Sequence, residues 1–178
     1  MADETSEIVL SERDLREITN FAAESAEEVL AIFEKAHPAD SRPRDAVVAA
    51  WTFARGGKRG KSLRDTASKA LKAARDADST AAGEAARAAM CAASAAYLHP
   101  LADAHQVKHI LGAAAYAARA AELVAGNSHV GAEHIERSGL RATPGVVDVL
   151  GRYPAPPPGG GRVGELLRVL DEALRSRL

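Results

Sequence analysis

Alanine dominates this chain and limits what it can fold into. About 40 of its 178 residues are alanine, whereas only 4% are aromatic. Alanine has the highest helix propensity, and the β-branched and aromatic residues that strands favour are scarce here. A net charge of only −1, together with strong apolar periodicity, argues against a disordered chain. The sequence therefore predicts an all-α fold, a single-domain bundle of about seven to eight helices.

Residues 80–98 are predicted to form the centre of that bundle. Glu84, Arg87, Cys91 and Ser94 fall within about 80° of the circumference of such a helix, and the remaining residues are mostly alanine. A helix that is apolar around most of its surface is buried by neighbours on several sides. We therefore expect an alanine-rich central helix that carries one narrow polar stripe.

Capping residues place the boundaries of other predicted helices. Ser11 with Asp14, three residues later, has the pattern of a capping box and predicts the start of the first helix. That helix is expected to end before the pair at 37–38, because a residue that precedes proline is pushed out of the α region. Ser62 with Asp65 has the same capping pattern and predicts the start of the third helix.

A long helix is predicted over residues 100–124, ending at the glycine–asparagine pair 126–127. Helical spacing puts its apolar residues toward the core and places Lys108, Arg119 and Glu122 in water. A row of residues follows the border between the two faces: His105, His109, Gly112 and Tyr116.

The composition changes near the C-terminus and suggests three parts. Residues 1–153 are expected to form the helical bundle, and the proline- and glycine-rich residues 154–161 a linker that is stiff in its first half. Residues 162–178 have leucines on one helical face. This amphipathic helix is predicted either to dock on the domain or to form an oligomer interface, such as that of a homodimer.

Charge and cysteine content exclude several classes of protein. The 23 basic and 24 acidic residues nearly cancel, so no global field attracts nucleic acid, and we expect no nucleic-acid partner. No apolar run is long enough to cross a bilayer and the N-terminus lacks a signal-peptide pattern, so we expect a cytoplasmic protein without membrane contact. The single cysteine excludes an internal disulfide.

We expect neither a metal nor another cofactor. His105 and His109 have a spacing that lets two imidazoles on one helix reach a single metal ion, but further ligands would have to come from elsewhere. Gln106 stands where a metalloprotease helix carries its glutamate. A polar border pair is the preferred interpretation of the two histidines.

A basic turn follows the second predicted helix. Its glycines and lysines suggest a phosphate-binding loop, but the spacing is too short and the preceding element is a helix rather than a strand. Five cations in ten residues nevertheless favour an acidic partner surface or another anion. The predicted binding residues are Arg55, Lys58, Arg59, Lys61 and Arg64.

Scarce polar and aromatic residues near predicted helix ends form a second candidate site. Arg42 and Arg44 flank a proline at a helix start, where a cation opposes the helix dipole and needs another partner. The candidate pocket comprises His37, Arg42, Arg44, Trp51, His99, His105, His109 and Tyr116. The sequence contains no recognisable pattern that combines a nucleophile, a base and an orienting group, so we assign no catalytic residue.

Several segments together suggest a family: residues 29–34 (VLAIFE), 40–45 (DSRPRD), 51–56 (WTFARG), 62–65 (SLRD), 97–102 (YLHPLA), 106–112 (QVKHILG) and 149–154 (VLGRYP). In these the chain resembles the actinobacterial putative immunity proteins, helical and alanine-rich, found beside polymorphic toxins. The resemblance covers residues 7–154 and implies a protein that binds and neutralises a cognate toxin. Some relatives carry an exonuclease label, but this chain has no phosphate loop and no carboxylate cluster that would support it.

Three functions therefore remain open at the level of sequence. The preferred one is an immunity-type protein that neutralises a toxin by contact and without catalysis. The alternative is a small-molecule-binding protein or small enzyme with a pocket near His37, Arg42, His99 and His109. The third is a structural homodimer built on the C-terminal helix.

Overall fold

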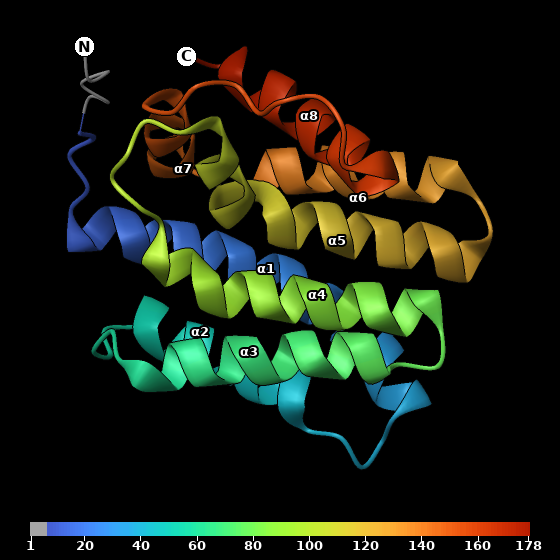
Figure 1. The fold of residues 1–178 in the computed structure, drawn as a ribbon. Helices are drawn as coiled ribbons and strands as arrows, with labels where there is room; N and C mark the ends of the chain where they lie inside the picture. The colour runs from blue at the N-terminus through green and yellow to red at the C-terminus, as the bar shows by residue number, and fades with distance from the viewer. Residues whose placement is uncertain (1–6) are drawn as a thin grey trace, which may run out of the picture.

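The computed structural model describes residues 7–178, which contain eight α-helices, two short 3-10 helices and no β-strand (Figure 1). The predicted all-α, single-domain bundle is thereby confirmed. In chain order the elements are α1 (Glu12–Ala36), α2 (Arg42–Ala54), α3 (Lys61–Asp76), α4 (Thr80–Ser94), η1 (Ala95–Tyr97), η2 (Ala104–Gln106), α5 (Val107–Ala125), α6 (Ser128–Arg141), α7 (Pro144–Gly151) and α8 (Gly161–Arg175).

Helix α4 lies at the centre of the bundle and packs against α1, α2, α3 and α5 (Figure 1). Most of its alanines are completely buried, and small residues allow the neighbouring backbones to come close. A Cβ atom added at Gly83 would lie 3.1 Å from the Ala74 carbonyl oxygen of α3, and one at Gly112 of α5 would lie 3.1 Å from the Cys91 sulfur. The alanine excess therefore produces a closely packed centre.

Three of the predicted helix boundaries are present as expected. Ser11 and Asp14 form the complete capping box at the start of α1, with reciprocal bonds of 3.0 and 2.9 Å. Helix α1 ends at Ala36, directly before the His37–Pro38 pair. Helix α5 ends at Ala125 and is capped by Gly126, whose φ of 64° is the left-handed conformation that glycine adopts without a Cβ clash.

The starts of two helices differ from the prediction. Gly60, in an extended conformation, is the N-cap of α3, and Ser62 lies inside the helix without a capping bond. Helix α5 begins at Val107, seven residues later than predicted, after the short η2. Two contacts accompany the late start: the Pro100 carbonyl accepts a 2.6 Å bond from the Ile8 amide, and Asp103, in an extended conformation, caps η2 by accepting from the His105 amide at 2.8 Å.

Glu122 was predicted to face water, and this is wrong, because it is 3% exposed. Helix α6 approaches closely at Gly131, where an added Cβ would lie 2.2 Å from the Glu122 carboxylate. Arg119 and Arg162 donate to that carboxylate at 2.7 and 3.0 Å. Arg162 belongs to the first turn of α8, so this buried ion pair joins the start of α8 to α5.

Helix α8 packs against α5, α6 and α7 (Figure 1). Its leucines 166, 167, 170 and 174 are buried in the common core. The proline- and glycine-rich residues 154–160, here called the strap, lead from α7 to the start of α8. Among residues 7–178, no helix is both long and apolar enough to cross a membrane.

Candidate functional site

A cavity of about 600 Å³ opens between α4, α5 and the first two turns of α8. A smaller cavity of about 210 Å³ lies beside it, under the strap, and shares four of its residues: Lys108, Gly160, Gly164 and Leu167. We call the larger cavity the α4–α5–α8 groove. Its lining residues are Glu84, Arg87, Met90, Cys91, Ser94, Lys108, His109, Gly112, Tyr116, Gly160, Val163, Gly164 and Leu167.

The wall contributed by α4 is the polar stripe that helical spacing predicted. Arg87 donates to Glu84 at 3.0 Å, and burial raises the pKa of the Glu84 carboxyl although the charges of Arg87 and Arg119 oppose the change. Burial likewise raises the pKa of the Cys91 thiol to about 12. The thiol is therefore protonated at neutral pH and is a poor nucleophile.

The wall contributed by α5 contains three of the four residues of the predicted border row, and adds a lysine. Burial lowers the pKa of His109, although the Ser94 backbone partly offsets the effect, so this imidazole is neutral at pH 7. Burial raises the pKa of Tyr116, which is protonated. Gly112 lies against Cys91, and Lys108 stands where the two cavities meet.

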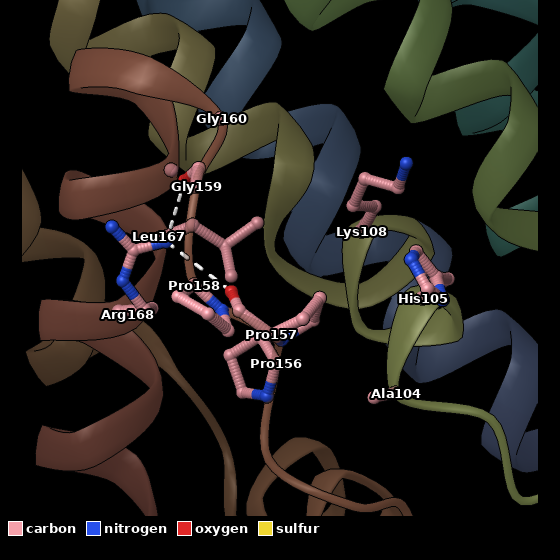
Figure 2. A pocket seen from close by; sticks show the side chains of 11 residues that line it. Ala104, His105, Lys108, Pro156, Pro157, Pro158, Gly159, Gly160, Leu167 and Arg168 are labelled. Atoms are coloured by element: carbon pink, nitrogen blue, oxygen red, sulfur yellow. Dashed lines mark hydrogen bonds between the residues drawn. The ribbon is translucent and has the colours of Figure 1, made fainter.

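Figure 2 shows the smaller cavity, in which the strap prolines face Lys108 and His105. Arg168 of α8 donates to the strap carbonyls of Pro157 and Gly159, at 3.3 and 2.6 Å, and so holds the strap in place. His105, the fourth residue of the border row, pairs with Asp103 at 3.0 Å. The hydrogen bonds from His105 to Asp103 lower the pKa of that carboxyl.

The basic turn lies at another part of the surface and is ordered by aromatic rings. The Arg55 guanidinium stacks 4.5 Å from the Trp51 ring, and those of Arg59 and Arg64 lie 5.3 and 4.3 Å from the Tyr97 ring. The Tyr97 hydroxyl donates to the Gly60 carbonyl at 2.8 Å.

Two further contacts hold the cations of the turn. Arg59 donates to the Ala96 carbonyl at 3.2 Å, and Lys61 pairs with Asp65 at 3.3 Å. Arg55, Lys58 and Arg64 form no ion pair with residues 7–178, and their side chains are exposed. The turn thus presents pre-ordered cations to solvent.

The remaining residues of the predicted pocket do not converge on the groove. Arg42 is held by Asp40 at 2.6 Å and by Asp76 at 3.1 Å, and both partners raise its pKa. Arg44 forms a two-point ion pair with Glu34. Each arginine thus has the acidic partner that a cation at a helix N-terminus needs.

The two histidines named with them lie elsewhere as well. The Nε2 atom of His37 accepts from the Asp78 amide at 3.5 Å. His99 is exposed, and its carbonyl accepts from the Tyr153 hydroxyl at 2.7 Å. Trp51 of α2 stacks with Arg55 of the basic turn and lines neither cavity. Of the eight residues of the predicted pocket, the structure places His109 and Tyr116 in the groove and His105 beside it.

Sequence reasoning missed the third wall of the groove. Val163, Gly164 and Leu167 come from α8, whose apolar face was recognised but whose docking position was left open. Nothing in the sequence pattern relates residues 160–167 to the row on α5. Within the part of the chain that the structure describes, no three His, Cys, Asp or Glu side chains gather where they could hold a metal ion.

The fold and these surfaces define an all-α single-domain protein with a pre-ordered cationic turn and a separate amphipathic groove. The chain belongs to a family described as Imm-5 like putative immunity protein, whose sequence profile matches residues 9–139. The matched range contains α1 to α5 and most of α6, whereas α7, the strap and α8 lie outside it. Searches of curated proteins and of solved structures found no match.

Proposed function

We propose that this chain is an immunity protein that acts in the cytoplasm, binds a partner toxin and neutralises it by contact, without catalysis. Membership in the immunity-protein family supports the general role. We assign the toxin-binding surface to the basic turn, because its exposed arginines are stacked on Trp51 and Tyr97.

The residue types of this turn are those that dominate binding energy at protein interfaces. Arginine, tryptophan and tyrosine are enriched among interface residues whose truncation costs most affinity. Stacking restricts Arg55 and Arg64 before any partner arrives, so less conformational entropy is lost on binding. The rigid support of η1, through Tyr97, makes the turn a preformed surface.

The charge of the turn indicates the chemistry of its partner. Arg55, Lys58 and Arg64 have no acidic partner among the described residues, so an acidic protein surface complements them. Such complementarity accelerates encounter and selects the partner, and both effects weaken as salt rises. We therefore assign the turn to an acidic patch on the toxin.

The test is growth rescue and co-purification with the toxin-like proteins encoded beside this chain's gene. The wild-type chain should rescue cells that express one of them, and R55E/K58E/R64E should lose both rescue and co-purification. The control K69E/K72E reverses two exposed cations on the body of α3 and should retain both.

Two results would overturn the proposal. In the first, wild-type chain rescues growth against none of the neighbouring proteins. In the second, the triple variant, folded by its circular dichroism spectrum, rescues as well as wild type, which would place the contact elsewhere.

A further inference from the structure

We propose that the α4–α5–α8 groove is a binding site for a small amphipathic monocarboxylate, with its carboxylate at Lys108 and its apolar body along α8. The groove shares no residue with the basic turn, so this site is separate from the proposed toxin contact. Its α8 wall also lies outside the range matched by the family.

The charge facing the groove favours a ligand with one negative charge. Glu84 and Arg87 pair with each other, and His109 is neutral at pH 7 because burial opposes its protonation. Lys108 is exposed and forms no ion pair with any of residues 7–178. The charge of Lys108 reaches the Asp103 carboxylate, which His105 already holds, but no carboxylate pairs with the ammonium group directly. A ligand carboxylate can therefore pair with it at the junction of the two cavities.

The remaining lining favours an apolar body attached to that carboxylate. Met90 of α4 and Val163 of α8 are half-buried and line the groove together with Leu167. Covering them would remove further apolar surface from water, which stabilises a complex in proportion to the area covered. A small hydrophilic anion such as acetate would leave these apolar side chains exposed to water.

A hydrogen-bond donor and the size of the groove complete the site. The Tyr116 hydroxyl is protonated, half-buried and has no hydrogen-bond partner among the described residues. It can donate to a polar substituent on the ligand. The volume of about 600 Å³ falls within the range of small-molecule sites in proteins.

The strap closes one side of the site. Figure 2 shows Arg168 bonded to the strap carbonyls, with Lys108 on the opposite side of the smaller cavity. Arg168 donates both bonds from Nη1 and keeps its positive charge, but it lines only the smaller cavity. Lys108 is the cation that lines both cavities. A carboxylate at Lys108 would lie beside the strap, and the apolar body would extend into the larger cavity.

The test is isothermal titration calorimetry of the full chain with decanoate below its micelle concentration. Decanoate should bind, acetate should not, and decylammonium should bind at least about tenfold more weakly because its charge has the wrong sign. K108M should weaken decanoate about tenfold, and K108E should reverse the preference between decanoate and decylammonium. V163W, which fills the groove, should abolish binding.

The control K69M removes an exposed lysine from α3 and should leave decanoate binding unchanged. The proposal is overturned if wild-type chain does not bind decanoate, if decanoate and decylammonium bind equally, or if K108M and K69M behave alike. Rescue from a toxin by K108M, measured in parallel, separates the two proposals, since the toxin contact does not require this lysine.

Discussion

The buried carboxylate of Glu122 should be one of the largest polar contributions to the stability of this fold. It accepts from Arg119 Nη1 at 2.7 Å and from Arg162 Nε and Nη2, both at 3.0 Å. Bonds to charged groups contribute about 1.5–3 kcal/mol each. Both arginine side chains are about one-third exposed and would regain water when the carboxylate is removed. We therefore expect E122A to lower the free energy of unfolding by only about 3 kcal/mol in total.

Glu165 provides a matched control, because it pairs with the same arginine at 3.2 Å but is 59% exposed. E165A should cost less than about 1 kcal/mol, as exposed ion pairs do. R162A should cost about as much as E122A, since it leaves a buried carboxylate with Arg119 alone. Urea denaturation at pH 7, followed by circular dichroism, measures all three variants.

The pKa of Glu122 gives a second readout of the same ion pair. Burial raises this pKa, but the hydrogen bonds from Arg162 and Arg119 outweigh burial and lower it. The stability from the pair is therefore present above the unfolded pKa of glutamate and is lost as pH falls through the lower folded value. If E122A costs no more than E165A at pH 7, Glu122 does not anchor α8 and the reasoning fails.

Two other predictions concern packing and pH. A89L should destabilise the chain by about 1–3 kcal/mol because Ala89 is completely buried in the central helix, whereas A132L, on an exposed position of α6, should be neutral in thermal melts. Burial lowers the pKa of both His109 and His134, so the unfolded chain binds these protons at higher pH than the folded one. The contribution of these neutral histidines to the free energy of unfolding should be fully present above about pH 6.5 and should be lost as the pH falls below it. In H109N/H134N the urea midpoint should therefore depend less on pH between pH 5 and 7.

Local patterns predicted the parts of the fold whose causes are local. The capping box of Ser11 and Asp14 and the left-handed Gly126 depend on residues within one helical turn, and both are present. The polar stripe of α4 follows from helical spacing alone. The start of α5 was misplaced in part because the bond between Pro100 and Ile8, which takes up a carbonyl of the predicted first turn, joins residues far apart in the chain.

The candidate site was predictable only in part for the same reason. Spacing placed His109 and Tyr116 in one row, and the structure keeps them together in the groove. His37 and His99 were grouped with them because both lie near predicted helix ends, and the ends of different helices need not meet. For Glu122 the prediction from helical spacing was wrong. Its position on α5 predicted a side chain exposed to water, but α6 and α8 pack over it.

The sequence by itself determined that this chain is helical, where several helices begin and end, and which face of the central helix is polar. These properties arise from propensity, capping and periodicity, which act over a few residues. Only the tertiary structure decided that α8 packs on α5 and α6, and that its Val163 and Leu167 close a groove over the stripe of α4. Docking of this kind depends on shape and on buried ion pairs between distant segments, which no local pattern contains.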